Sequence, residues 1–263
     1  ALEERVPAPQ SGRHPAVSLH QRRPHRGRRG YTAGVHRDAL RVSIVVPVGP
    51  GESAWTALPD LLTRLELDHE IVLSAAEEPT REPPDGVRVV RGMAGRAHQL
   101  NAGIAAARAE WLWLLHADSR PGTATLAAAA AFIAAHAKPE RPALGWFELA
   151  FDRDGPAAVA LNARGANLRS RRFSLPFGDQ GWLMTRRTFD QVGAFDAGFS
   201  RVEDVVFVVR ARRRGVAIEP VGAALTTSAR RYREQGWLRT SATHGWFTLW
   251  LWMRAVLRSR RRR

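Results

Sequence analysis

Two residues of the segment LLHADS, His116 and Asp118, carry side chains that can bind a divalent metal ion. They follow the apolar run 111–115, which is typical of a buried strand. Residues two apart on a strand point to the same side, so the two side chains share one face if the strand persists. A carboxylate and an imidazole could then hold a cation, with phosphate oxygens and water completing its shell. The alternative is an aspartate that only caps the following helix, which is the commoner role at such a position.

Glu203 and Asp204 form a second acidic pair, at the start of a stretch with helical spacing. Carboxylates at a helix start interact favourably with the helix dipole and accept hydrogen bonds from its free N–H groups. A carboxylate held there could also act as a general base toward an acceptor hydroxyl. The residues alone leave both roles open.

Two further polar pairs lie between apolar or aromatic residues. Asp179 and Gln180 stand within LPFGDQGW, where a turn explains the glycines but not the acid and the amide. Arg230 and Arg231 stand within TTSARRYREQGW, and they could bind phosphate through charge-assisted hydrogen bonds or lie on a solvated turn.

The elements that must position these side chains alternate between strands and helices. We expect strands at 41–48, 69–75, 86–92, 111–117, 143–152 and 181–187, helices at 55–67, 95–110, 122–137, 157–171 and 202–215, and one or two strands within 216–231. This alternation predicts an α/β domain with a largely parallel sheet flanked by helices. Ligands of such sheets bind beyond the carboxyl ends of the strands, here at the loops 49–53, 75–80, 92–96 and 117–121.

Composition narrows the class of protein. The 263 residues are 44% hydrophobic, which indicates a globular chain able to bury a core. The absence of cysteine excludes disulfides and thiolate metal sites, and it fits a cytoplasmic protein. The formal charge of +15 includes +5 in residues 1–40 and +6 in residues 254–263, which leaves +4 for the residues between. The central part shows no recognition helix or base-stacking platform, so we expect no nucleic-acid partner.

The two ends differ from the centre. Residues 1–40 have no hydrophobic period and are rich in Pro, Gly, Arg and His, which predicts a disordered basic extension. Residues 238–263 are predicted to form a Trp-rich helix and a polybasic tail. The apolar run within 244–263 is about a dozen residues, and a membrane span takes ~20. This segment either lies on the inner face of a membrane, through its tryptophans and arginines, or packs as a terminal helix against the core.

Five blocks in this order resemble family 2 glycosyltransferases of the GT-A fold, over residues 41–237. The blocks are GRAHQLNAG, LHAD, GWFEL, FGDQG and TSARRY, and they are most similar to the bacterial selenodomain-associated transferases. HAD stands where the family usually has Asp-x-Asp, and VED resembles its Glu-Asp motif. The chain departs from the family at the end of its second strand, where Ser74 and Ala75 replace the usual Asp. It also lacks the Asn that usually precedes the loop glutamate, here Glu52.

The resemblance implies a metal-dependent, inverting, hexosyltransferase-type enzyme that moves a sugar from a UDP- or GDP-sugar to an unidentified acceptor. It implies that Asp204 is the catalytic base, assisted by Glu203, and that Asp118 holds Mn²⁺ or Mg²⁺. His116 would be a second ligand or a contact to the donor. The other expected residues are Pro47, Glu52, Arg96, Gln99, Asn101, Arg230 and Arg231 for the nucleotide-sugar, and Trp146, Asp179 and Gln180 for the sugar and acceptor pocket. The alternatives are a nucleotidyltransferase and a degenerate transferase that only binds nucleotide.

Overall fold

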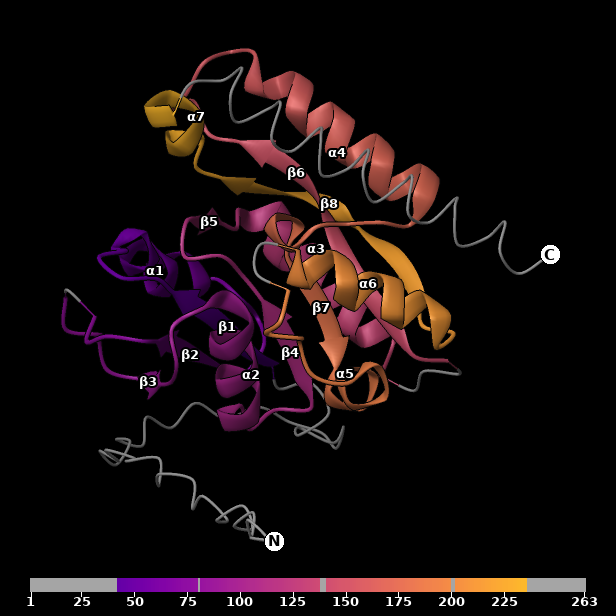
Figure 1. Cartoon of the computed structure of the whole chain (residues 1–263), viewed down its shortest axis with the longest axis horizontal. Helices are drawn as coiled ribbons and strands as arrows, with labels where there is room; N and C mark the ends of the chain where they lie inside the picture. Colours follow the sequence, from indigo (N-terminus) through magenta and orange to yellow (C-terminus); the bar gives the residue numbers. More distant parts are fainter. Residues whose placement is uncertain (1–41, 80, 138–140, 200–201, 236–263) are drawn as a thin grey trace, which may run out of the picture.

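The computed structural model describes residues 42–79, 81–137, 141–199 and 202–235. Within these ranges an eight-stranded mixed sheet, of order β3-β2-β1-β4-β7-β6-β8-β5, is flanked by helices (Figure 1). The predicted α/β fold with a mostly parallel sheet is confirmed. The extension 1–40 and the segment 238–263 lie outside the described residues, so their predicted structures stay predictions.

The strands form two parallel groups joined through antiparallel β7. β1 pairs in parallel with β2 and β4, β2 with β3, and β6 with β8, whereas β7 runs antiparallel to β4 and β6, and β5 to β8. Their bounds are β1 Val42–Val48, β2 His69–Ala75, β3 Val87–Arg91, β4 Trp111–Leu114, β5 Ser119–Arg120, β6 Ala143–Phe151, β7 Trp182–Thr185 and β8 Ala217–Thr227.

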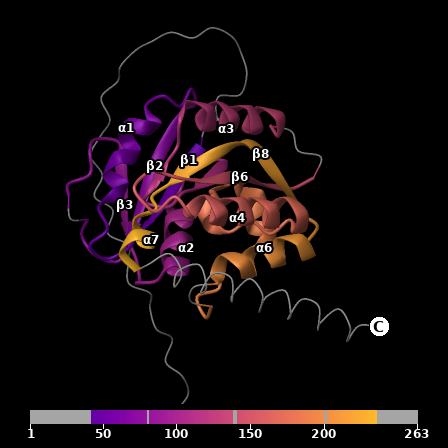
Figure 2. The same ribbon diagram turned by 90° about the horizontal axis from the view of Figure 1, so that it is seen from above.

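The helices cover both faces of this sheet. Figure 2 shows α1 and α3 on one side and α2, α4 and α6 on the other. Their bounds are α1 Leu58–Leu62, α2 Arg96–Ala106, α3 Thr123–Ala135, α4 Val159–Phe173, α5 Arg186–Val192, α6 Glu203–Arg213 and α7 Arg230–Gln235, with 3₁₀ turns η2 Ala54–Ala57 and η3 Gly178–Gln180. None of the helices in the described part of the chain is long and apolar enough to cross a membrane.

The central strands β1 and β4 are largely apolar because they are covered on both faces. Ile44 of β1 and Trp113 of β4 belong to the core cluster under α1 and α3. Their neighbours Val45 and Leu114 belong to the cluster under α2 and α6. Successive side chains of a strand point to opposite faces, so a continuous apolar run is what a sheet between two helical layers requires.

β4 ends earlier than the predicted strand 111–117, and this changes the argument about the positions of His116 and Asp118. The strand stops at Leu114, and residues 116–119 form a turn in which the N–H of Ser119 donates to the carbonyl of His116 at 3.1 Å. The backbone N–H of His116 also donates to the Ser119 hydroxyl at 3.1 Å. His116 and Asp118 therefore belong to a turn, so the strand does not persist to these residues and the condition for a shared strand face is not met.

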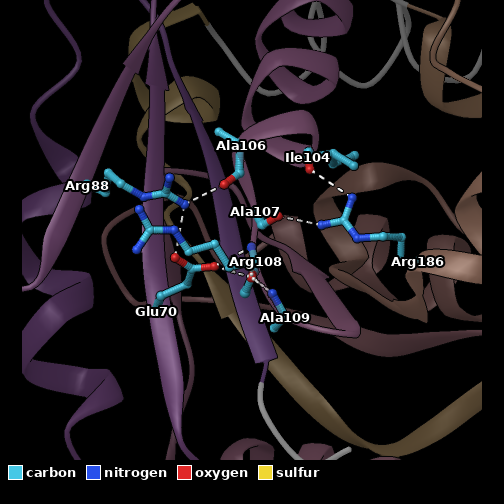
Figure 3. Close-up of polar contacts among 9 residues, drawn as sticks. Glu70, Arg88, Ile104, Ala106, Ala107, Arg108, Ala109 and Arg186 are labelled. Carbon is cyan, nitrogen blue, oxygen red and sulfur yellow. Dashed lines mark hydrogen bonds and ion pairs between the residues drawn. The ribbon is translucent and has the colours of Figure 1, made fainter. Parts of the chain in front are cut away.

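Polar side chains connect the elements at the amino ends of the strands β1 and β2 (Figure 3). The buried carboxylate of Glu70 accepts hydrogen bonds from the Ser43 hydroxyl at 2.6 Å, from Arg88 at 2.9 Å and from the backbone N–H of Arg108 at 2.6 Å. Arg88 also donates to the carbonyl of Ala106, the last residue of α2. This network joins the amino ends of β1 and β2 to the carboxyl end of α2.

Candidate active site

Segments far apart in the sequence meet beyond the carboxyl ends of β1, β2 and β4. They are the loop after β1, the start of α2, the turn after β4, the segment around η3, the start of α6, and the junction of β8 with α7. The described contacts that join them are those of Arg96, Asp204 and Glu52. This is the edge at which parallel α/β sheets bind ligands.

Arg96 is the cation at the centre of the site. It begins α2 directly after Gly95, whose φ of 114° is a conformation that favours glycine. Its Nε lies 3.4 Å from Oε1 of Glu203, and its Nη1 lies 3.5 Å from Nδ1 of His116. A Cβ at Gly178 would lie 2.5 Å from its Nη2, so only glycine permits this approach.

His116 presents a neutral imidazole to the site. Burial lowers the pKa of His116 well below its ordinary value, and the positive charges of Arg96 and Arg231 lower it further. A guanidinium can only donate hydrogen bonds, so the contact with Arg96 makes Nδ1 the acceptor and leaves the proton on Nε2. Nε2 is buried, and among the described residues it has no hydrogen-bond partner. It is therefore available to a ligand.

Asp118 is a carboxyl group removed from water. Burial raises the pKa of Asp118 above its ordinary value, although a hydrogen bond from the Thr227 side chain opposes this shift. The negative charge of Glu52 raises the pKa further, and the positive charge of Arg231 lowers it. A bound cation would favour the ionised form of this group.

Asp204 is oriented by backbone groups on both of its oxygens. The N–H of Gly178 donates to Oδ2 at 3.0 Å, and the N–H of Val205 donates to Oδ1 at 2.7 Å. The preceding Glu203 is buried and pairs with Arg96. The start of α6 is thus tied to both the η3 segment and α2.

Asp179 adds a second carboxyl group beside Asp204. Its Oδ1 is buried and has no hydrogen-bond partner in the described part of the chain. Burial raises the pKa of Asp179, the charge of Arg169 opposes the shift, and the nearby charge of Asp204 raises the pKa further. Asp179 is therefore a buried carboxyl group for which the fold disfavours the ionised form.

Arg169 of α4 is a site residue that the sequence reasoning missed. Its guanidinium carbon lies 3.4 Å from the centre of the Phe177 ring, and its Nε donates to the carbonyl of Leu175 at 2.9 Å. Its positive charge reaches Asp179 and Asp204. One signal in the sequence could have indicated it. Arg169 is adjacent to Ser170, and the helical period places Ser170 on the buried face of α4 together with Ala163.

Glu52 and Arg230 link the loop after β1 to α7. Nη2 of Arg230 lies 3.1 Å from Oε2 of Glu52, and the N–H of Ala54 donates to Oε1 at 2.8 Å. Arg231 is exposed, and its charge acts on His116 and Asp118. Pro47 is half-buried in β1, opposite Ser74 of β2.

Two of the expected donor residues form bonds within the protein. The buried amide of Gln99 donates to the carbonyls of Val48 and Ser74, the latter at 3.2 Å, and so ties β1 to β2. Asn101 exchanges two hydrogen bonds with the backbone of Phe195, at 2.8 and 2.9 Å. The structure places both residues in the frame that supports the site.

The same holds for two expected residues of the sugar and acceptor pocket. Gln180 is fully buried, and its Oε1 accepts from the Ser170 hydroxyl at 2.6 Å while its Nε2 donates to the carbonyl of Phe147 at 3.2 Å. Trp146 is only 1% exposed and belongs to the core cluster under α2 and α6. Among the described residues, Asp179 Oδ1 and Trp146 Nε1 are both buried without a hydrogen-bond partner, and of the two residues only Asp179 carries an acidic group.

A metal ion would find few protein ligands here. The described residues contain no cluster of three or more His, Asp or Glu side chains able to hold one. The desolvated carboxyl of Asp118 fits an ion that takes its remaining ligands from a bound diphosphate and water. Chemically, the site combines two arginines and a neutral imidazole, which suit a diphosphate, with carboxyl groups that can accept a proton.

Known structures share this fold. S. aureus TarS residues 1–349 superimpose with a TM-score of 0.54 and 16% identity, covering 72% of this chain and 60% of that one. The same TarS fragment in complex with UDP-GlcNAc gives 0.53 and 16%, covering 72% and 58%. Glucosyl-3-phosphoglycerate synthase from Mycobacterium tuberculosis, in complex with Mn²⁺, UDP and phosphoglyceric acid, gives 0.50 and 17%, covering 76% of each chain. The chain thus spans about 60% of the length of the TarS fragment, and these identities establish likeness of fold alone.

Comparison with protein families goes further. No curated protein matches the chain. The family model described as glycosyltransferase-like family 2 matches residues 65–246, well over half of the sequence. The match includes the start of α2, the turn after β4, the η3 segment and the start of α6, which together supply most of the candidate site. The chain is a member of glycosyltransferase-like family 2.

Proposed function

We propose that the protein transfers a sugar from a UDP- or GDP-sugar to an acceptor hydroxyl, with inversion at the anomeric carbon. The observation that carries the proposal is the arrangement of Asp204. Its two carboxylate oxygens are oriented by backbone N–H groups, at 3.0 and 2.7 Å, in a segment separate from Asp118 and the arginines. Two fold relatives support the donor class, since TarS is described with UDP-GlcNAc and the M. tuberculosis enzyme with UDP and Mn²⁺.

The diphosphate of the donor would bind between Arg96, Arg231 and His116. The guanidinium groups neutralise its charge, and the Nε2–H of the neutral imidazole donates to a phosphate or ribose oxygen. This is a different role from metal ligation. The 3.5 Å contact of Nδ1 with Arg96 favours it, because the proton then lies on the nitrogen that faces the ligand.

Asp118 would hold a divalent cation together with the diphosphate. When bound, the ion would supply positive charge that stabilises the departing nucleoside diphosphate. Oxygen ligands from Asp118, the phosphates and water suit Mg²⁺ or Mn²⁺. The raised pKa of the Asp118 carboxyl supports this assignment, since a nearby cation would relieve the cost of its buried charge.

Asp204 would act as the catalytic base. The acceptor oxygen attacks the anomeric carbon as the bond from that carbon to the diphosphate oxygen breaks, and the hydroxyl proton passes to the Asp204 carboxylate. Glu203 acts as a positioning residue, because its 3.4 Å ion pair with Arg96 ties the base-bearing helix to the donor side. Asp179 is the remaining candidate for contact with sugar or acceptor.

Two narrower parts of the proposal rest on the sequence alone. They are membership of the selenodomain-associated subgroup and contact of residues 244–263 with the inner face of a membrane. The acceptor that such an enzyme would use is unidentified.

Asp204→Asn tests the assignment of the base. We expect release of nucleoside diphosphate from the donor sugar, with the acceptor or with water as nucleophile, to fall by about 10²- to 10⁴-fold. The dissociation constant of the nucleoside diphosphate should stay within about threefold, because the proposed diphosphate contacts are Arg96, Arg231 and His116 and not Asp204. Asp190→Asn, at an exposed position of α5, is the matched control and should keep the full rate. Full activity of Asp204→Asn would refute the assignment.

A further inference from the structure

Arg169 of α4 contacts the segment Leu175–Gln180 at both of its ends and in its middle. Its Nε donates to the carbonyl of Leu175 at 2.9 Å, and its Nη2 donates to Oε1 of Gln180 at 3.3 Å. Between these ends lies the ring of Phe177, whose centre is 3.4 Å from the guanidinium carbon. A planar guanidinium can donate along its edge and stack on an aromatic face at the same time, whereas an ammonium group is a point charge. One side chain therefore spans the whole segment.

The chain enters this segment through a backbone conformation that is unfavourable for its residue. α4 ends at Phe173, and the next residue, Ser174, has φ 49° and ψ 48°, in the left-handed region. It is the one non-glycine residue with a positive φ in the described part of the chain. This conformation costs about 1–2 kcal/mol in a residue with a Cβ, and it persists only where surrounding contacts fix it. Arg169 supplies such contacts, because it precedes Ser174 in the sequence and its partners follow it.

The backbone of the segment reaches the proposed base. The N–H of Gly178 donates to Oδ2 of Asp204 at 3.0 Å, and Oδ1 accepts from the N–H of the neighbouring Val205. Among the described residues, Gly178 thus supplies the hydrogen bond that relates this carboxylate to an element outside α6. A displacement of the segment by about 1 Å would take this contact out of hydrogen-bond range.

The charge of Arg169 lies on the same side of the site. Burial lowers the pKa of Arg169, and the negative charges of Asp179 and Asp204 oppose this shift. The two carboxyl groups are therefore close enough to interact with the guanidinium charge. Lysine at this position would keep the positive charge and lose the planar geometry, so a substitution can separate the two properties.

We propose that Arg169 is a positioning residue for the base of the transfer reaction, and that it acts by holding the segment Leu175–Gln180 in place. With the segment held, Gly178 orients Asp204 toward the acceptor hydroxyl. This role rests on the proposed function, because the orientation of Asp204 matters for the reaction only if Asp204 is the base.

The first measurement compares Arg169→Lys with Arg172→Lys, at an exposed position of the same helix. We expect Arg169→Lys to release nucleoside diphosphate from the donor sugar about 10- to 100-fold more slowly, because a 1 Å misplacement of reacting groups has a cost of this order. The KM for the donor should stay within about threefold, since the diphosphate contacts Arg96, Arg231 and His116 are unchanged. Arg172→Lys should keep the wild-type rate. A wild-type rate of Arg169→Lys would overturn the proposal, since charge alone would then suffice.

A double-mutant cycle shows whether Arg169 acts through Asp204. In the Asp204→Asn background, Arg169→Lys should slow the remaining reaction by less than about threefold, because the group that it positions has already been removed. An equal loss in both backgrounds would mean that Arg169 acts independently of the base, and the proposal would be wrong. Full activity of Asp204→Asn would instead refute the proposed function itself, and the role of Arg169 with it.

Hydrogen exchange gives a readout that needs no activity. The backbone amides of residues 175–180 should exchange at least about tenfold faster in Arg169→Lys than in wild type or Arg172→Lys, because local opening of the segment becomes easier. Unchanged exchange would overturn the proposal and leave Asp204 as the base. Melting temperatures establish that each variant is folded. If Arg169→Lys does not fold, Phe177→Leu takes its place, because it removes the ring under the guanidinium and keeps the charge. Wild-type exchange and rate in Phe177→Leu would then overturn the proposal.

Discussion

At the scale of single residues, the candidate site depends on close packing around one guanidinium. Arg96 reaches Glu203 and His116 at the same time because Gly178 leaves room for its Nη2. The amide of the same glycine orients Asp204. One backbone position thus connects the donor side of the proposed reaction to the base.

Gly178→Ala should disrupt the contacts of Arg96 with His116 and Glu203. The added Cβ would lie 2.5 Å from Arg96 Nη2, so the flexible end of the arginine must move away from His116 and Glu203. We expect nucleoside diphosphate to bind about tenfold more weakly, which corresponds to about 1.4 kcal/mol, as measured by isothermal titration calorimetry.

Gly165→Ala is the matched control. Nothing lies within 4 Å of the Cβ that would be added at this position of α4, and alanine is favoured over glycine within a helix by roughly 0.5–1 kcal/mol. The control should be slightly more stable and bind nucleotide as wild type does. Unchanged binding by Gly178→Ala would contradict the account of Arg96.

Asp118 gives a prediction about stability and pH. Its pKa is raised in the fold, so the fold disfavours the ionised form, which is the form that a carboxyl group takes at pH 7 in the unfolded chain. The favourable contribution of the neutral form is present at low pH and is lost as the pH rises through the raised pKa. Asp118→Asn should therefore raise the melting temperature of the ligand-free protein at pH 7, on the order of 2 °C.

The gain should shrink as the pH falls, because wild type then becomes neutral at this position too. Mn²⁺ with nucleoside diphosphate should stabilise wild type and not the variant. A lower melting temperature of Asp118→Asn at pH 7, without ligand, would contradict the electrostatic argument.

At the scale of elements, α2 is fixed at both ends. Its start carries Arg96, and its carboxyl end is held by Arg88 on the carbonyl of Ala106 and by Arg186 on the carbonyls of Ile104 and Ala107, at 3.2 and 2.6 Å (Figure 3). Cations at a helix carboxyl end satisfy free carbonyls and interact favourably with the dipole. The position of Arg96 is thus set partly by contacts at the far end of its helix.

Glu70→Gln tests how much the polar network at the carboxyl end of α2 contributes to stability. The substitution leaves Arg88 without its carboxylate partner in a buried setting, and we expect the free energy of unfolding to fall by about 2–4 kcal/mol. Urea denaturation measures the change. Glu66→Gln, at an exposed position before β2, should change it by less than about 0.5 kcal/mol. Equal stabilities of the two variants would mean that the network contributes little.

Strand and helix periodicity predicted the order of the elements well, since apolar runs and helical spacing are local signals. It could not predict where β4 ends. The apolar residues Leu115 and Ala117 are buried in the turn as fully as they would be in a strand. The helix α5 was missed because it is short and begins where β7 was expected to continue, with Thr185 accepting the hydrogen bond from the N–H of Thr188 that starts the helix.

The sequence motifs predicted which segments contribute to the candidate site, but they could not predict the contacts of each side chain. Gln99 and Gln180 lie in segments that form the candidate site, but their amides form hydrogen bonds within the protein. Both donate to backbone carbonyls, and Gln180 also accepts from Ser170 of α4. Such bonds depend on partners up to 51 residues away in the sequence, which no local pattern encodes. Arg169 was missed for the same reason, because its partners are the η3 segment and the carboxyl groups it approaches in space.

At the scale of the whole molecule, the amino and carboxyl edges of the sheet differ in their polar contacts. The amino edge carries a polar network in which Glu70 accepts hydrogen bonds from Ser43, Arg88 and Arg108, while Arg88 Nε has no partner among the described residues. The carboxyl edge carries further buried polar atoms without a partner in this part of the chain, at His116 and Asp179. Unsatisfied buried groups lower stability, and they persist where a ligand completes them.

The most direct test of the proposed donor class is thermal stability with nucleotides. The full chain is melted with UDP, GDP, ADP, CDP and the UDP- and GDP-sugars, each with and without Mn²⁺. A ligand at 100 times its dissociation constant stabilises the folded state by about 2.7 kcal/mol, which raises the melting temperature by roughly 5–10 °C. We expect UDP or GDP, with its sugar, to give this rise only with Mn²⁺. No rise with any of these nucleotides, with or without the metal, would contradict the proposal.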